Sequence, residues 1–124
     1  MKVLIVDDEE ELVETLVARL RRRQFTPVGA TNGPEALEIL SSETFDVVLV
    51  DVKMPGMSGL ELLKEIKARS PHQQVVMLTG HGSAQHAEEG LQLGAFAYLM
   101  KPVKLPVLIE ILTNATNHQE GSEQ

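Results

Sequence analysis

The stretch FDVVLVD, residues 45–51, decides how this sequence is expected to fold. Its four consecutive apolar residues, 47–50, are typical of a strand buried on both faces, as the central strand of a parallel sheet is. The run stops at Asp51, a residue type that is seldom fully buried unless it is paired. We therefore expect a central strand over 45–51 that carries a carboxylate at its C-terminal end.

Three other short apolar runs stop at a polar residue in the same way. These runs and the residues that follow them are 3–6 with Asp7 and Asp8, 75–78 with Thr79, and 96–100 with Lys101. If the runs are parallel strands, three carboxylates, a hydroxyl and an ammonium group share one edge of the sheet. Open α/β folds place their functional sites at that edge.

Helical spacing of apolar residues separates the strands, as in alternating βα units. The expected inward positions are Leu12, Val13, Leu16, Val17 and Leu20, then Ala36, Leu37 and Leu40, then Leu60, Leu63 and Ile66, then Ala84, Ala87 and Leu91, and finally Leu105, Leu108, Ile109 and Leu112. Helix starts are expected at Pro34, Ser58 and Ser83, and Gly94 is suited to end the fourth helix. A weaker strand over 26–31 belongs at the sheet edge, because its proline and glycine would interrupt a central strand.

These elements predict an α/β fold, a flavodoxin-like doubly wound (βα)5 three-layer sandwich. Its parallel sheet has the strand order 2-1-3-4-5, with right-handed crossovers. The predicted domain covers residues 1–112. Residues 113–124 are polar and lack a core period, so we expect a tail that is disordered or begins a linker.

Composition narrows the class of protein. The chain has 124 residues, a net charge of −7 and no cysteine. The negative charge argues against a nucleic-acid surface, and the missing cysteines exclude disulfides and thiolate metal sites. No signal peptide or membrane segment is visible, so we expect a cytoplasmic protein without nucleic-acid or membrane partners.

The polar residues at the sheet edge suit phosphoryl chemistry. Three neighbouring carboxylates repel one another unless a cation joins them, and Mg²⁺ prefers oxygen ligands. A carboxylate can also act as a nucleophile. A transferring phosphoryl group spreads negative charge over its oxygens, which Lys101 and the Thr79 hydroxyl can meet.

Four motifs resemble the receiver domain of bacterial two-component response regulators, the family of the chemotaxis-type regulators. They are V-D-D-E at 6–9, V-D-V-K-M-P-G-M-S-G at 50–59, L-T-G-H-G at 78–82 and Y-L-M-K-P at 98–102. The resemblance covers residues 1 to 112. It implies a phosphoacceptor switch in a phosphorelay rather than a turnover enzyme.

The resemblance also implies roles for individual residues. Asp51 would accept the phosphoryl group from a sensor histidine kinase or a histidine phosphotransfer protein. Mg²⁺ or Mn²⁺ would be held directly by Asp8, Asp51 and the backbone carbonyl of Lys53, and through water by Asp7. The switch residues would be Thr79, Tyr98 and a cis Pro102, and the residues that tune hydrolysis would be Lys53 and His81. The fourth helix, fifth strand and fifth helix would form an output face, possible also as a homodimer contact.

Two other functions fit parts of the pattern. A Mg²⁺-dependent phosphatase with an aspartate nucleophile usually has a second acid two residues later, but Lys53 occupies that position and no cap domain is present. A flavodoxin-like flavin protein needs aromatic residues and a glycine-rich phosphate loop. This chain has one tyrosine, three phenylalanines and no tryptophan, and no such loop follows its first strand. The kinase and the output remain open, as does the choice between a stand-alone receiver and part of a longer regulator.

Overall fold

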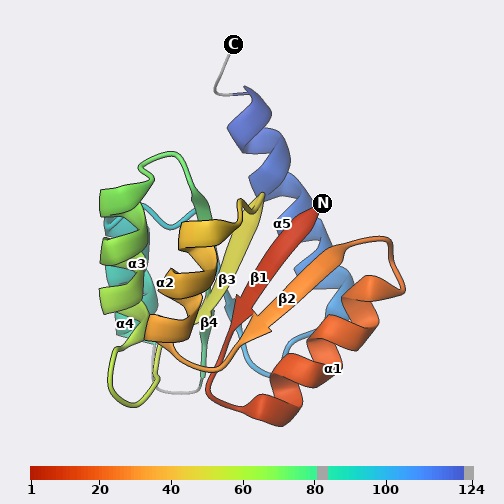
Figure 1. Cartoon of the computed structure of the whole chain (residues 1–124), viewed down its shortest axis with the longest axis horizontal. Helices are drawn as coiled ribbons and strands as arrows, with labels where there is room; N and C mark the ends of the chain where they lie inside the picture. Colours follow the sequence, from red (N-terminus) through yellow and green to blue (C-terminus); the bar gives the residue numbers. More distant parts are fainter. Residues whose placement is uncertain (81–83, 122–124) are drawn as a thin grey trace.

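Within residues 1–80 and 84–121, which the computed structural model describes, five strands form one parallel sheet (Figure 1). The strands are β1 (Lys2–Val6), β2 (Thr26–Ala30), β3 (Val47–Asp51), β4 (Gln74–Thr79) and β5 (Ala97–Met100). They pair in the order β2-β1-β3-β4-β5. The expected fold class and strand order are confirmed.

Helices cover both faces of the sheet and complete three layers. They are α1 (Glu10–Arg21), α2 (Gly33–Ser42), α3 (Gly59–Arg69), α4 (Ala84–Gln92) and α5 (Leu105–Gly121). Figure 1 shows α2, α3 and α4 on one side of the sheet and α1 and α5 on the other. None of these helices, over the described residues, has both the length and the apolar character needed to cross a bilayer.

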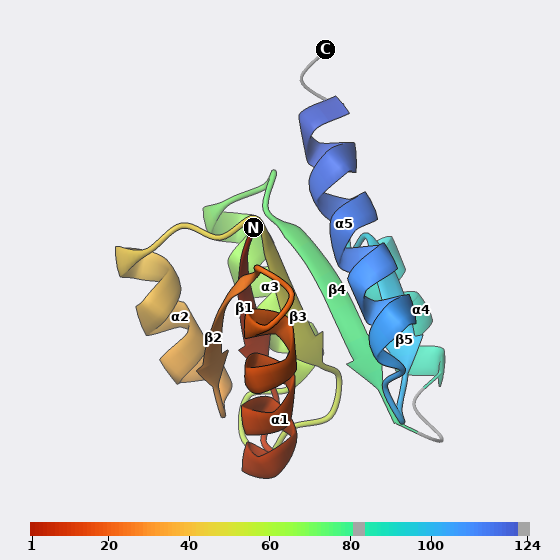
Figure 2. The ribbon, with the colours of Figure 1, turned by 90° about the vertical axis from the view of Figure 1, so that its right-hand side faces the viewer.

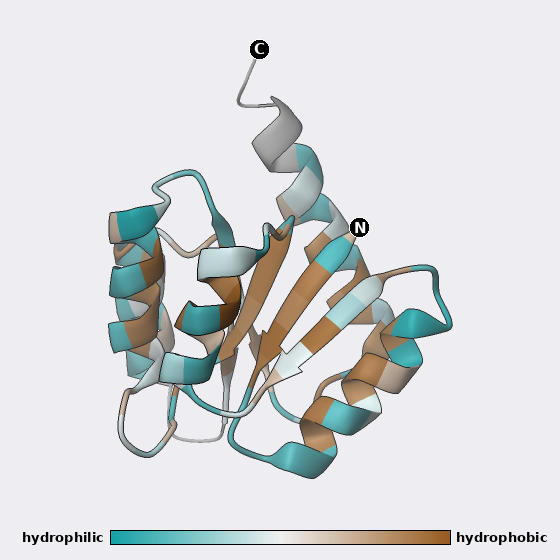
Figure 3. Ribbon diagram, in the orientation of Figure 1, coloured by the Kyte–Doolittle hydropathy of each residue, from teal (hydrophilic) through white to brown (hydrophobic). Residues whose placement is uncertain are grey.

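Each face of the sheet has its own apolar core. Alternate residues of one strand enter different cores, so Val48 and Val50 pack toward α2 and α3, whereas Val47 and Leu49 pack toward α1 and α5. Every residue of β3 is buried, as its unbroken apolar run predicts. The central strands β1 and β3 are strongly apolar, whereas the edge strand β2 is paler in Figure 3. β2 pairs with β1 alone, which confirms its predicted edge position.

Local capping explains where two of the helices begin. The Asn32 side chain accepts a hydrogen bond of 2.8 Å from the Glu35 amide at the start of α2. Ser58 and Glu61 form a reciprocal capping box at the start of α3. Ser83, the predicted cap of α4, lies outside the described residues.

Helix α4 buries Ala87 as predicted, but Gly90 and not Leu91 lies against the sheet beside it. Ala87 and Gly90 are buried, whereas Leu91 is 40% exposed. A Cβ atom on Gly90 would lie 3.2 Å from Met77 Cγ, so the helix approaches the sheet closely along its small residues. The expectation that Leu91 faces the core is therefore wrong, because small size rather than hydropathy selects the contact face here.

Helix α5 continues through Gly121, where the sequence led us to expect a polar tail from residue 113. Ala115 and Thr116 are buried, and the Thr116 hydroxyl donates a 3.2 Å hydrogen bond to the Leu112 carbonyl. Ala115 and Thr116 extend the packed face of α5, because the threonine hydroxyl is hydrogen-bonded within its own helix. Neither residue is strongly apolar, so the sequence pattern does not reveal this part of the helix. Figure 2 shows the far end of α5 projecting beyond the sheet. The division of the chain into a domain and a linker at residue 112 stays a prediction.

The junction between β3 and α3 leaves no room for a side chain at Gly59. A Cβ atom there would collide with the Asp51 carbonyl oxygen and lie 2.7 Å from the Val52 Cα atom. The Gly59 amide also donates a 2.8 Å hydrogen bond to the Val52 carbonyl. The start of α3 is therefore pressed against the end of β3.

We predict that Gly59→Ala lowers the free energy of unfolding by about 1–3 kcal/mol, because the added methyl forces the backbone apart. Urea denaturation followed by circular dichroism measures this change. Gly80→Ala is the matched control, since no described atom lies within 4 Å of a Cβ at Gly80. We expect that variant to stay within about 0.5 kcal/mol of the unmodified protein. Equal stability of the two variants would contradict the assignment of a steric constraint at Gly59.

Candidate functional site

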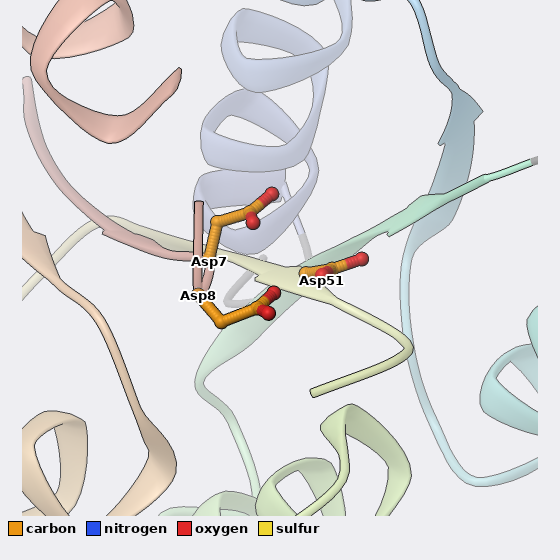
Figure 4. Close-up of side chains that lie close together, drawn as sticks. All are labelled: Asp7, Asp8 and Asp51. Carbon is orange, nitrogen blue, oxygen red and sulfur yellow. The ribbon is translucent and has the colours of Figure 1, made fainter. Parts of the chain in front are cut away.

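The ends of β1 and β3 bring three carboxylates together (Figure 4). The strands pair with Val6 opposite Val50, so the residues that follow, Asp7 and Asp51, lie side by side. Single oxygen atoms of Asp7, Asp8 and Asp51 all lie within 4.8 Å of one another. Asp7 is fully buried and Asp51 is 4% exposed, whereas Asp8 is open to solvent.

Lys101 enters the same cluster from the end of β5. Its Nζ lies 2.9 Å from Asp7 Oδ2 and 3.6 Å from Asp51 Oδ1. The backbone helps to place it, because the Lys101 amide donates a 2.8 Å hydrogen bond to the Thr79 carbonyl. The structure thus joins residues that are far apart in the sequence.

Thr79 occupies the end of β4, next to β3 in the sheet. It is fully buried, and its hydroxyl donates a 3.3 Å hydrogen bond to the Gly80 carbonyl. The β3–β4 register sets Asp51 opposite Leu78, the residue before Thr79. The hydroxyl therefore belongs to the same edge of the sheet as the carboxylates.

Burial and mutual repulsion shift the acid–base balance of the cluster. Burial, followed by the charge of Asp7, raises the pKa of Asp51 to about 7, although Lys101 opposes the shift. Burial also raises the pKa of Asp7, against the Glu9 amide and Lys101. Burial alone would lower the pKa of Lys101, but the carboxylates of Asp7, Glu9 and Asp51 raise it overall. Lys101 therefore stays protonated, whereas Asp51 gives up its proton less readily than an ordinary aspartate.

The donor set fits a divalent cation. Asp7 Oδ2 is buried and forms no hydrogen bond with the described residues, although Lys101 Nζ lies near it as an ion-pair partner. The single positive charge of Lys101 cannot balance three ionised carboxylates. The atoms that these three residues offer as metal ligands are all carboxylate oxygens. Mg²⁺ and Mn²⁺ accept such ligands. Asp7, Asp8 and Asp51 are the residues that would hold the ion. Their separate roles, direct for Asp8 and Asp51 and through water for Asp7, stay predictions, as does a ligand role for the Lys53 carbonyl.

The other residues predicted for the site differ in how far they are buried. The Lys53 side chain is exposed, two residues beyond Asp51. Tyr98 is partly buried against the core beneath α2, α3 and α4. Pro102 is exposed, and its peptide bond with Lys101 is cis, as expected. His81 lies outside the described residues, so its role in tuning hydrolysis stays a prediction.

Glu9 is a site residue that sequence reasoning missed. Its carboxylate oxygen Oε1 lies 3.0 Å from Lys101 Nζ, and its amide donates a 2.9 Å hydrogen bond to Asp7 Oδ1. Glu9 stands in an acidic run with Glu10 and Glu11. It also closes the V-D-D-E motif at 6–9, but the sequence reasoning gave it no role, and its contact with Lys101 appears only where the end of β5 approaches it.

Comparison with known proteins agrees with this geometry. The family model for the response regulator receiver domain matches residues 3–113. The chain belongs to this family. It is 38% identical over 122 residues to the DNA-binding transcriptional regulator NtrC of Escherichia coli K12, and 42% identical over 114 residues to the response regulator protein PilR of Pseudomonas aeruginosa. These matches cover 98% and 92% of this receiver chain, and 26% of each relative.

Solved structures show the same receiver fold. The receiver domain protein of Clostridium thermocellum has a TM-score of 0.92 and 36% identity, with 96% of each chain covered. NtrX of Brucella abortus has a TM-score of 0.94 and 28% identity, over 98% of this chain and 28% of the other. The receiver chain thus spans about a quarter of the length of the curated relatives it matches.

We predict that Mg²⁺ stabilises this receiver domain more at about pH 8 than at about pH 5. The folded-state pKa of Asp51, about 7, lies above its ordinary value of 3.8. An acid with a raised folded-state pKa contributes stability at low pH and loses that contribution as the pH rises from its ordinary value through 7. Divalent cations compete with the same proton, so their benefit grows as Asp51 ionises.

Thermal unfolding with and without Mg²⁺ at the two pH values measures this effect. Asp51→Asn is the control, because it keeps the shape of the side chain and cannot ionise. In that variant the gain from Mg²⁺ should be small and nearly independent of pH. An equal gain at both pH values in the unmodified protein would contradict the prediction.

Proposed function

We propose that this receiver domain accepts a phosphoryl group on Asp51 with the help of Mg²⁺ or Mn²⁺, and converts it into a conformational change. The observation that carries the proposal is the buried Asp51 carboxylate, flanked by Asp7, Asp8 and Lys101 at the sheet edge. The donor would be a phosphohistidine on a sensor histidine kinase or a phosphotransfer protein. We place this exchange in the cytoplasm, without a membrane or nucleic-acid partner for this chain.

Asp51 is the nucleophile in this scheme. One of its carboxylate oxygens forms a bond to phosphorus while the phosphorus–nitrogen bond of the donor breaks, and the electron pair of that bond returns to the imidazole nitrogen. A divalent cation held by Asp7, Asp8 and Asp51 would offset the negative charge of the transferring phosphoryl group. Burial of Asp51 limits the access of water to the reacting carboxylate.

Lys101 and Thr79 would stabilise the product. The Lys101 ammonium lies 3.6 Å from Asp51 Oδ1 and is close enough to pair with an oxygen of the attached group. The Thr79 hydroxyl bonds a backbone carbonyl at 3.3 Å, a long contact that a phosphoryl oxygen could replace. Exchange of that bond would move the end of β4.

Movement at β4 would reach the surface through Tyr98. This ring is partly buried on β5, next to β4, and the Thr79 shift would give it room to turn inward. The surrounding α4-β5-α5 surface exposes several large apolar side chains, namely Leu91, Leu93, Met100 and Val107. We propose this surface as the output face, with a downstream partner or a second copy of the chain as its occupant.

The competing activities are less well supported by the site. A phosphatase with an aspartate nucleophile usually has a second acidic residue two positions later. In this chain that position holds the exposed cation Lys53. A flavin site needs aromatic stacking surfaces, which a chain with one tyrosine and no tryptophan scarcely offers. The match to the receiver-domain family over residues 3–113 favours a signalling role over both alternatives.

We predict that Asp51→Asn abolishes labelling by acetyl phosphate or phosphoramidate, because the amide lacks the nucleophilic carboxylate. Intact-protein mass spectrometry measures the added phosphate. Asp46→Asn is the matched control, since Asp46 lies before β3, away from the carboxylates, and accepts a hydrogen bond from the Lys2 amide that an asparagine oxygen can also accept. Labelling of Asp51→Asn, or undiminished labelling of the unmodified protein in EDTA, would refute the assignment.

We predict that Lys53→Asn speeds loss of the phosphoryl group by about 3- to 10-fold, which is roughly 1 kcal/mol of barrier. The Lys53 ammonium can lie across the phosphoryl group and obstruct water, whereas an amide can orient a water molecule for attack. The decay of phosphorylated protein at saturating Mg²⁺ measures the rate. Lys64→Asn changes an exposed lysine on α3 and serves as the control. Decay of Lys53→Asn that is unchanged or slower would show that Lys53 does not shield the site.

A further inference from the structure

The Lys101 ammonium is shared unequally among three carboxylates. Nζ lies 2.9 Å from Asp7 Oδ2 and 3.0 Å from Glu9 Oε1, but 3.6 Å from Asp51 Oδ1. In this state the cation therefore stands closer to the β1–α1 junction than to the proposed phosphoacceptor. Any contact that it makes with a phosphoryl group on Asp51 must compete with the two nearer partners.

Glu9 differs from Asp7 in how easily it can release the lysine. The Glu9 side chain is 62% exposed, so water can solvate its carboxylate as soon as the ion pair opens. Asp7 is fully buried and has no such compensation. An exposed ion pair is a weak one, which makes the Glu9 contact the one that can break and re-form.

The backbone holds Glu9 in place for this contact. Its amide is bonded to Asp7 Oδ1 at 2.9 Å, and the residue immediately precedes α1. The Glu9 side chain makes no capping hydrogen bond to α1, so the helix does not compete with Lys101 for its carboxylate. Glu9 and Lys101 also line one groove together with Pro102 and Val103, between α1 and the segment after β5.

We propose that Glu9 is a positioning residue that holds Lys101 away from Asp51 before phosphorylation and competes with the phosphoryl group for the ammonium. This inference rests on the proposed function, because it concerns the same lysine and the same phosphoacceptor. The Glu9–Lys101 ion pair must break before Lys101 can pair with a phosphoryl group. It therefore reduces the free energy gained from that new contact, and with it the fraction of the receiver domain that changes conformation on phosphorylation.

The test is the affinity of the protein for beryllofluoride, an anion that mimics a phosphoryl group on the aspartate, at saturating Mg²⁺. Glu9→Gln removes the charge, and Glu9→Asp keeps the charge but shortens the reach to Lys101. Glu10→Gln is the matched control. It removes a neighbouring exposed charge that makes no ion pair with Lys101 among the described residues.

We expect both Glu9 variants to bind beryllofluoride about two- to fivefold more tightly, the scale of a broken exposed ion pair. Glu10→Gln should change the affinity less. The Mg²⁺ affinity measured without beryllofluoride should stay close to that of the unmodified protein in Glu9→Asp, which keeps the local charge. A purely structural disturbance of Asp7 would instead weaken Mg²⁺ binding.

Two outcomes would overturn the inference and leave the proposed function standing. In the first, Glu9→Gln binds beryllofluoride no more tightly than Glu10→Gln. In the second, Glu9→Asp matches the unmodified protein, which would make the effect one of charge alone and not of the pair with Lys101. A different result, failure of the unmodified protein to bind beryllofluoride at all, would refute the proposed function itself.

Discussion

Two buried carboxylates at neighbouring strand ends impose the constraint on which this site depends. Asp7 and Asp51 are both removed from water, which raises the pKa of each, and the charge of Asp7 raises the pKa of Asp51 further. Lys101, at the end of β5, offsets part of these shifts: its Nζ lies 2.9 Å from Asp7 Oδ2 and 3.6 Å from Asp51 Oδ1. The charge that remains suits a divalent cation, which prefers such oxygen ligands.

The sheet fixes this cluster with backbone contacts. The Val52 amide donates to the Leu78 carbonyl at 2.8 Å, and the Lys101 amide donates to the Thr79 carbonyl at 2.8 Å. These bonds tie together the ends of β3, β4 and β5. Gly59 brings α3 against the Asp51 carbonyl and closes the junction from the other side. Backbone hydrogen bonds and close packing therefore hold the strand ends on which the site residues stand.

Lys101 connects the resting arrangement of the site with its proposed response. Its position between Asp7, Glu9 and Asp51 means that a small change in charge at Asp51 alters the balance among its partners. Its backbone continues β5, the strand that carries Tyr98 and borders the exposed apolar face. Lys101, which offsets part of the negative charge of the site, thus directly follows the strand that would carry the response to the surface.

The sequence by itself determined the fold class, the strand order and most of the site, because unbroken apolar runs such as 47–50 allow few environments and the polar residues after them must share one edge. It placed Ala87 of α4 inward correctly but chose Leu91 over Gly90, which packs by its small size, and it did not show that α5 stays helical to Gly121. It placed Glu9 at the end of the V-D-D-E motif but assigned it no contact, because the partner of a side chain in an acidic run depends on which distant cation approaches it. Only the tertiary structure decided that choice, by bringing Lys101, 92 positions away in the chain, within 3.0 Å of the Glu9 carboxylate.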